Sequence, residues 1–322
     1  MKAWRTLRRR VLTPDVSQTL MSVRGFHVKD QAGRERLENV GRYFLTGYAA
    51  AAEARTAAEA EVPLEAVAAP YRGFAYEGAA MASAVRDALP GGGRHVRDLL
   101  AGRGDRHVYM AYVGVGWAMA RLPRPLWGRL HAPDPLLRWL VLDGYGFHQA
   151  YFKTSRYVDG QYRHDRFPWP VEGPADYAAR VVDQGVGRAT WFVCGTDARR
   201  VVQTFDRFAA DRRPDLYAGA GLAATYAGGA GAQELTWLRD AAGPYAADLA
   251  QGAAFAAGAR VRAGLVVPHN EVATRILCGL PTQAAAAVTD EARIDLAAVG
   301  ATPVYEVWRQ RIKSTFASTR RA

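Results

Sequence analysis

The chain has 322 residues, of which 49% are apolar and 23% are charged. A chain of this length and composition can bury a large core, so one or two folded domains are expected and disorder is excluded for most of it. Two cysteines, Cys194 and Cys278, are too few for a disulfide framework or a four-thiolate metal site. No cleavage signature follows the basic N-terminus, and residues 108–120, the longest uncharged apolar stretch, are too few to span a bilayer. These features predict a cytoplasmic protein.

The net charge of +11 is concentrated at the two ends of the chain. Residues 1–12 carry +5 and residues 306–322 carry +4, which leaves +2 on the 293 residues between them. A nearly neutral body without a basic stripe does not favour nucleic acid as a partner.

Residues 1–30 are expected to form a basic N-terminal segment. Trp4, Leu7 and Val11 recur at about helical spacing among arginines. This pattern is typical of a short amphipathic helix that lies on an anionic membrane or docks on a partner protein. The alternative is a solvated end segment, because so short a helix is marginally stable in water.

A short pattern of small residues occurs six times along the chain. It reads Gly, any residue, Gly or Ala, any residue and then usually Ala. The copies begin at Gly78, Gly114, Gly144, Gly185, Gly219 and Gly252. Proline and glycine turn signals separate the copies, so each copy belongs to its own helical unit. The spacing predicts an all-α domain over residues 31–300, built from tandem helix pairs as an α-solenoid or a curved α/α array. Residues 154–167 are an exception and favour a short hairpin or an ordered loop.

Paired glycines inside helices indicate close packing. Glycine costs about 1 kcal/mol relative to alanine in a helix interior, so its repeated use needs a structural reason. The first and fifth positions of the pattern share one helix face, and the third position points roughly opposite. Each repeat helix is therefore slim on two sides and fits between two neighbours. An Ala- and Gly-rich composition is the plainer explanation.

The C-terminal residues 301–322 combine an amphipathic helix with a basic tail. Tyr305, Trp308, Ile312 and Phe316 have helical spacing and should pack onto the body. The cations of this helix are expected on its exposed side, namely Arg309, Arg311 and Lys313.

A third face of the repeat helices gathers polar and large side chains. It combines the residue just before the first glycine of each copy with the residue three positions after that glycine. These pairs are Glu77 with Met81, Val113 with Trp117, Asp143 with Phe147, Gln184 with Arg188, Ala218 with Leu222, and Gln251 with Phe255. In a curved array this face lines the concave side, as an apolar and aromatic pocket with a few polar groups. The alternative is an ordinary core with polar residues at helix caps.

Arg188 departs from the repeat because its slot otherwise holds Met, Trp, Phe or Leu. In a pocket, its guanidinium could bind a carboxylate, a phosphate or a thioester carbonyl. A structural role, in an ion pair with Asp183 or Asp197, is the alternative.

His148 replaces the usual alanine and could act as a general acid or base, or be a buried core histidine. Asp143 lies five residues earlier, so the two side chains diverge around a helix and a dyad is not favoured. Asp143 is expected to cap a helix that starts at Gly144.

Motifs for phosphate, nucleophile or zinc chemistry are missing from the sequence. The run from His269 to Glu271 follows Pro268 and favours a helix start over a set of metal ligands. We therefore expect neither a metal nor a cofactor.

Five segments together resemble the UnbL-like family of unknown function, which is encoded in bacterial enediyne biosynthetic gene clusters. They are FAYEGAAMASAVRDAL (74–89), HVYMAYVGVGWAMARL (107–122), LLRWLVLDGYGFHQAYF (136–152), DQGVGRATWFVCG (183–195) and LAQGAAFAAGARVRAG (249–264). The resemblance covers nearly the whole chain. It implies a place beside the iterative polyketide synthase whose linear conjugated polyene becomes the enediyne core, and it assigns no catalytic residue.

Three functions are compatible with these patterns. In the first, the protein binds a conjugated polyene or similar hydrophobic intermediate and assists its isomerisation or cyclisation by proton transfer. The substrate-binding residues would then be Trp117, Phe147, Phe255, Arg188, Gln184 and Gln251, and the catalytic residues Glu77, Asp143 and His148. The second is a non-catalytic scaffold that docks a synthase or a membrane partner. The third is a cyclase of an isoprenoid-like polyene, although the paired-aspartate clusters of such enzymes are missing.

Overall fold

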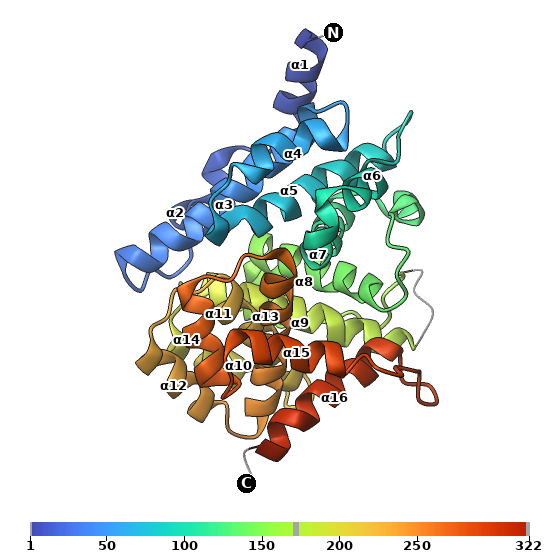
Figure 1. Cartoon of the computed structure of the whole chain (residues 1–322). Helices are drawn as coiled ribbons and strands as arrows, with labels where there is room; N and C mark the ends of the chain where they lie inside the picture. The colour runs from blue at the N-terminus through green and yellow to red at the C-terminus, as the bar shows by residue number, and fades with distance from the viewer. Residues whose placement is uncertain (1, 170–173, 320–322) are drawn as a thin grey trace.

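The computed structural model describes residues 2–169 and 174–319, without the side chains of residues 2–4, 7, 175 and 319. Helices and turns make up this part of the chain, and an isolated bridge between Val299 and Thr302 is its sole β interaction. The predicted all-α fold is therefore confirmed (Figure 1). None of the helices described has the length and apolarity needed to cross a bilayer.

The α-helices follow one another in chain order. Their bounds are α1 (Lys2–Leu12), α2 (Met21–Arg24), α3 (Gln31–Glu53), α4 (Ala57–Glu65), α5 (Ala69–Ala88), α6 (His95–Ala101), α7 (Val108–Arg121), α8 (Leu140–Phe152), α9 (Ala175–Val193), α10 (Ala198–Phe205), α11 (Arg213–Tyr226), α12 (Ala232–Ala241), α13 (Ala246–Ala263), α14 (Pro268–Leu277), α15 (Thr282–Glu291) and α16 (Val304–Thr319). Short 3-10 turns lie between them, at η1 (Val16–Thr19), η2 (Arg103–His107), η3 (Arg124–Arg129), η4 (Leu137–Trp139) and η6 (Gly243–Tyr245), and a π-helical turn, η5, spans Ser155–Asp159.

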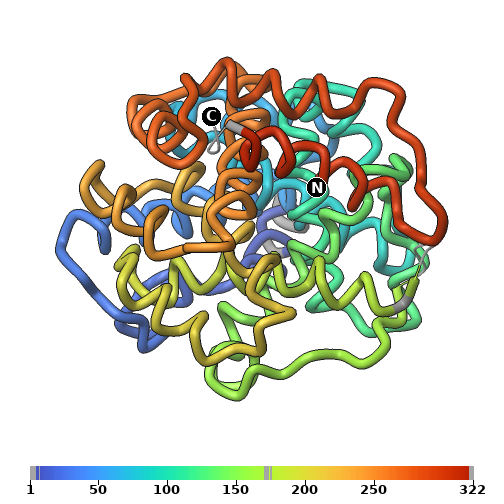
Figure 2. Tube along the Cα trace, turned by 90° about the horizontal axis from the view of Figure 1, so that it is seen from below, coloured from blue at the N-terminus to red at the C-terminus, as the bar shows by residue number. Residues whose placement is uncertain are grey.

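The six helices that carry the repeated pattern, α5, α7, α8, α9, α11 and α13, pack side by side in chain order. The row curves until its ends meet. Arg260 of α13 donates hydrogen bonds to the carbonyl oxygens of Ala69 and Pro70 at the start of α5, over 3.1 and 3.0 Å. Phe74 of α5 meets Tyr226 of α11 edge to face, with ring centroids 5.1 Å apart. The array is thus curved far enough to bring its two ends into side-chain contact, and we call it the ring. Figure 2 shows the rounded outline of the whole molecule.

Backbone contact between the repeat helices explains the glycines. A Cβ atom on Gly185 would lie 2.1 Å from the carbonyl oxygen of Asp143 in the preceding helix. A Cβ on Gly187 would lie 2.1 Å from the carbonyl oxygen of Leu216 in the following helix. The first glycine of the pattern therefore faces one neighbour and the second faces the other. The packing reason for the pattern is confirmed, and composition alone does not account for it.

The outer layer is less regular than a series of helix pairs. α6, α10 and α12 each lie between two inner helices in the chain, as the pairing predicts, and α14 follows the last inner helix. Between α7 and α8 the chain makes only the 3-10 turns η3 and η4. Residues 154–167, between α8 and α9, form the π-helical turn η5 and a loop, so the loop alternative is correct and the hairpin is not.

The N-terminal helix α1 lies against α3 and α4, at the opposite end of the molecule from the C-terminus (Figure 1). Arg5 pairs with Glu59 over 2.7 Å and Arg9 pairs with Glu53 over 2.9 Å. Arg8 donates to three backbone carbonyls at the end of α3. Much of the positive charge of this helix is therefore bound by the protein itself. The side chains of Trp4 and Leu7 lie outside the described residues.

The C-terminal helix α16 packs on α13 and α15. Its four predicted apolar anchors are fully buried, namely Tyr305, Trp308, Ile312 and Phe316. The expectation that Arg309 is exposed is wrong, since only 4% of this residue is accessible. Its guanidinium lies 2.7 Å from Asp215 and 3.3 Å from Glu306, which are buried carboxylates that require a cation.

Candidate functional site

A cavity of about 70 Å³ lies inside the ring of repeat helices. The third face of the pattern contributes six of its lining residues, namely Glu77, Met81, Trp117, Phe147, Arg188 and Leu222. A second cavity of about 30 Å³ shares Arg188 and Leu222 with it and adds Val113, Asp143 and Phe255 from the same face. The third face therefore points to the centre of the ring, where its polar groups are enclosed.

Aromatic rings form about a third of the cavity lining. The ring centroid of Trp117 is 4.6 Å from that of Phe44 and 5.2 Å from that of Phe147. Phe44 belongs to α3, which sequence reasoning did not include among the repeats. The signal was present, because Gly47 begins the sequence GYAAA and packs directly against the backbone of Ala75. A seventh copy of the pattern would have placed α3 in the inner layer.

Tyr151 and Phe152 of α8 also line the cavity and were missed. Tyr151 stacks on Phe147 with a centroid separation of 5.7 Å. Tyr151 follows Phe147 by four residues, so it occupies the same helix face one turn later. Extending each predicted face by one turn would have found it.

An ion pair between α8 and α9 lies between the two cavities. The Nη2 atom of Arg188 is 3.0 Å from Oδ1 of Asp143, and the two side chains are 6% and 0% exposed. The side-chain amide of Gln184 donates to Oδ2 of Asp143 over 2.8 Å and lies 3.3 Å from the hydroxyl of Tyr305. Arg188 Nε makes no hydrogen bond within the described part of the chain.

Two expectations about these residues need correction. Asp143 does not cap a helix at Gly144, because α8 already begins at Leu140 and Asp143 lies inside its first turn. Arg188 pairs with neither Asp183 nor Asp197. The first is held by Arg212 over 2.6 and 2.9 Å, and the second caps α10 by accepting two backbone N–H groups.

Glu77 of α5 is buried in the cavity wall, with 3% of the residue exposed. Burial raises the pKa of its carboxyl to about 7, because a charge in apolar surroundings is unfavourable. The negative charge of Asp143 raises the pKa further. The positive charge of Arg188 and the indole N–H of Trp117 both lower it. Glu77 is therefore populated in both its protonated and its ionised form near neutral pH.

His148 of α8 also lines the cavity. Its ring stands perpendicular to Trp117 at 5.4 Å and lies 4.6 Å from Phe152. Burial lowers the pKa of His148 to about 3, and the charges of Arg121, Lys153 and Arg24 reinforce the shift. The imidazole is thus neutral at physiological pH. It can form a hydrogen bond with a ligand but carries no extra proton to donate as an acid.

The remaining predicted site residues lie toward α16. Phe255 packs on Trp308 at 4.5 Å and lines the smaller cavity. Gln251 accepts a hydrogen bond from Nε of Arg309 over 3.2 Å, and Gln184 contacts Tyr305. Neither glutamine lines the main cavity. The structure therefore gives the amide of Gln184 and the amide oxygen of Gln251 partners within the protein, whereas Nε2 of Gln251 has none among the described residues.

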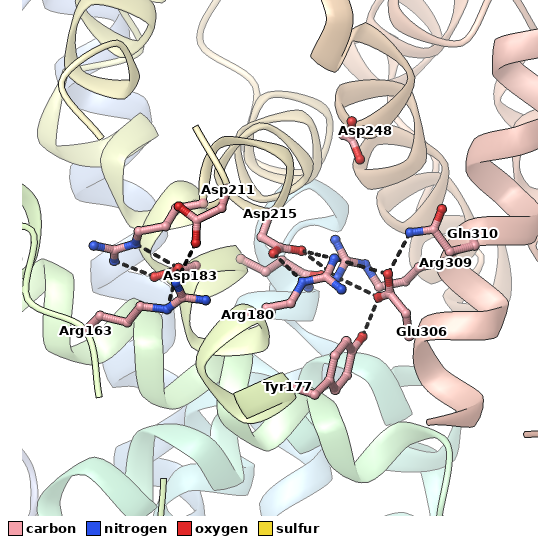
Figure 3. A network of polar contacts seen from close by, with 12 residues as sticks. Arg163, Tyr177, Arg180, Asp183, Asp211, Asp215, Asp248, Glu306, Arg309 and Gln310 are labelled. Carbon is pink, nitrogen blue, oxygen red and sulfur yellow. Dashed lines mark hydrogen bonds and ion pairs between the residues drawn. The ribbon is translucent and has the colours of Figure 1, made fainter. Parts of the chain in front are cut away.

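A buried ionic network fixes α16 beneath the ring (Figure 3). Arg180 of α9 lies 3.0 Å from Asp215 of α11 and 3.1 Å from Glu306 of α16. The hydroxyl of Tyr177 donates to Glu306 over 2.7 Å, and Arg309 bridges Glu306 and Asp215. Burial acts to raise the pKa of Glu306, but the charges of Arg309 and Arg180, with two hydrogen bonds, hold it below its usual range. These contacts make α16 part of the wall that encloses the smaller cavity.

The described residues contain no group of three His, Cys, Asp or Glu side chains placed to hold a metal ion. The model of the DUF1702 family, described as a protein of unknown function, matches residues 3–316, so the chain belongs to this family. Neither the curated proteins nor the solved structures include a significant match.

Proposed function

We propose that this DUF1702 protein binds a hydrophobic conjugated chain in its central cavity and moves a proton on that chain through Glu77. Such a protein would be a cofactor-independent isomerase or cyclase. One observation supports this proposal above all. Two buried carboxylates, Glu77 and Asp143, act on a single guanidinium, Arg188, at the wall of an aromatic cavity.

The charges of this cluster favour a stored proton. Arg188 supplies the positive charge of the cluster, and Asp143 lies in direct contact with it. A second ionised carboxylate would leave the buried cluster with an uncompensated negative charge, which is costly in apolar surroundings. The pKa of Glu77 is therefore raised to about 7, so the carboxyl keeps its proton at lower pH. A general acid and base works best when its pKa lies near the operating pH.

The cavity wall suits a flat conjugated molecule. The wall contains the ring of Trp117, whose centroid lies 4.6 Å from that of Phe44 and 5.2 Å from that of Phe147. Aromatic faces pack well on other π systems and stabilise developing positive charge. Glu77 would donate its proton to one carbon of the chain, and its carboxylate would then remove a proton from another carbon. One C–H bond forms and another breaks, the double bonds shift, and no electrons are exchanged with a cofactor. Ring closure after protonation would use the same groups.

The resemblance to the UnbL-like family supports a narrower substrate. A linear conjugated polyene released by an iterative polyketide synthase fits a pocket of this chemistry. We therefore propose that the reaction belongs to enediyne-type polyketide biosynthesis.

Proton exchange in deuterated buffer tests the function directly. The purified protein would be incubated with conjugated polyenes near neutral pH, and deuterium incorporation and double-bond position would be followed by mass spectrometry and NMR. We expect incorporation with the native protein, its loss in Glu77→Gln, and its retention in Glu35→Gln, which changes an exposed carboxyl of α3. Exchange that persists in Glu77→Gln would contradict the proposal. So would an inert native protein that still binds the polyenes, and that result would favour the scaffold function.

A further inference from the structure

The main cavity has one end that reaches the surface, between η1 and the C-terminal ends of α7 and α8. Gln18 and Thr19 of η1, Arg121 at the end of α7 and Phe152 at the end of α8 all belong to its lining. Arg121 is exposed and Gln18 and Phe152 are half-buried. We refer to this end, defined by Gln18, Thr19, Arg121 and Phe152, as the mouth.

Three cations near the mouth have no carboxylate partner among the described residues. Arg121 makes no ion pair or hydrogen bond with the residues that the structure describes. The guanidinium of Arg24 lies 4.8 Å from the ring of Phe152 and donates to two neutral oxygens, the carbonyl of Phe152 and the side chain of Gln18. Lys153 is exposed beside them. All three cations act electrostatically on His148, so their fields reach the cavity.

Other polar groups at the mouth add to this arrangement. His148 is 8% exposed, and its Nδ1 atom has no hydrogen-bond partner within the described ranges. Nε of Arg24 is likewise buried and unpartnered there. Glu38, a carboxylate that also acts on Tyr151, is already paired with Arg34 over 3.1 Å and accepts the N–H of Met21. The mouth therefore has spare hydrogen-bonding capacity and an excess of positive charge.

The inner end of the cavity has the opposite character. Arg188 is already neutralised by Asp143, and Glu77 is a second acid close to the same guanidinium. An anionic group placed there would meet two carboxylates and would lose its hydration in return for a cation that is already paired. The predicted role of Arg188 in holding an anionic end of the substrate is therefore not favoured by the charges around it.

We infer that the ligand is a conjugated polyenoic acid that binds tail first. Its carboxylate lies at the mouth between Arg121 and Arg24, within reach of His148. Its apolar chain extends along the cavity lining, past Trp117, toward Glu77. This inference rests on the proposed function, because it names the substrate class and orientation for the same cavity. It also gives Arg188 a different task, which is to set the protonation of Glu77.

Calorimetric titration with matched acids and amides tests the orientation. Sorbic acid and its trienoic homologue would be compared with their primary amides, which have nearly the same shape but no charge, at a pH well above the acid pKa. We expect the acids to bind about tenfold more tightly than the amides, as one or two charge-assisted hydrogen bonds would give. Added salt should reduce this preference, because the mouth is open to solvent.

The variants locate the charge that is responsible. Arg121→Gln combined with Arg24→Gln should abolish most of the preference for the acid, whereas Arg121→Lys should keep it. Arg10→Gln removes an exposed arginine of α1 and should change nothing. Arg188→Gln should leave the preference intact. A preference that survives loss of both Arg121 and Arg24 but disappears in Arg188→Gln would overturn the inference. So would equal binding of acid and amide, or no binding of either, to the native protein. Failure of the proposed function is distinguishable, because it would show as absent proton exchange with the acid preference intact.

Discussion

Arg188 and Asp143 form an ion pair of 3.0 Å between two helices whose backbones are in contact. Gly185, which lies about one helical turn before Arg188, makes this contact. It packs on the backbone carbonyl oxygen of Asp143. The register that seats the glycine therefore also places the guanidinium at the carboxylate. The repeated pattern and the candidate site are two consequences of the same helix contact.

Replacing Gly185 by alanine should destabilise the protein. The new Cβ would lie 2.1 Å from the carbonyl oxygen of Asp143, so the two helices must separate. We expect a loss of about 3 kcal/mol in the free energy of unfolding, despite the better helix propensity of alanine. Chemical denaturation provides the measurement. Gly128→Ala is the matched control, because nothing lies within 4 Å of its Cβ position. Equal stability of the two variants would show that the helix contact does not need glycine.

Glu77→Gln should stabilise the protein at high pH. The pKa of Glu77 rises from 4.5 in the unfolded chain to about 7 in the folded protein. Between these values the folded state binds more protons than the unfolded state, so the native protein loses stability as the pH rises. The amide removes this loss, which amounts to about 3 kcal/mol above pH 7. Unfolding curves of both proteins, recorded at intervals of about one pH unit between about pH 4 and about pH 8, measure the difference in the free energy of unfolding. A difference that does not change with pH would contradict the raised pKa.

His148 should make the protein sensitive to acid. Its pKa falls from 6.5 in the unfolded chain to about 3 in the folded protein. Below 6.5 the unfolded state takes up the proton first, so the native protein loses about 1.4 kcal/mol for each pH unit down to about 3. A His148→Phe variant lacks this titration, and its stability should fall less steeply over the same range. Thermal unfolding of both proteins as a function of pH would show parallel curves if His148 remained accessible to protons.

Loss of Arg309 should be among the most damaging changes in α16. Arg309→Met leaves Asp215 and Glu306 buried with less positive charge, and removing one partner of a buried ion pair costs about 3–5 kcal/mol. Arg97→Met, at an exposed arginine of α6 that lies 3.9 Å from Asp98, should change the stability by less than about 0.5 kcal/mol. Urea unfolding compares the two. Similar small effects would mean that the network in Figure 3 does not anchor α16.

The small-residue pattern predicted the inner face because it is a local property of each helix. Gly185 and Gly187 mark the two faces of α9 that contact neighbouring helices. Gln184 and Arg188 lie on a third face of this helix, which points to the centre of the ring. The sequence could not show that Arg309 would be buried, because its partner Asp215 lies 94 residues away on another helix. Closure of the ring likewise depends on Arg260 reaching the first turn of α5. Interactions between distant segments decide which polar groups are satisfied, and helical periodicity does not encode them.

The position of α16 has a consequence for how the protein is made. Tyr305 and Trp308 are buried against the repeat helices, yet they belong to α16, which follows all of those helices in the chain. Until α16 has been synthesised, Gln184, Gln251 and Asp215 lack the partners that it supplies, and the nascent chain has polar groups facing an unfinished interior. Chains that terminate prematurely before residue 304 would therefore be recognised as incomplete by proteases and chaperones, even with every glycine contact in place.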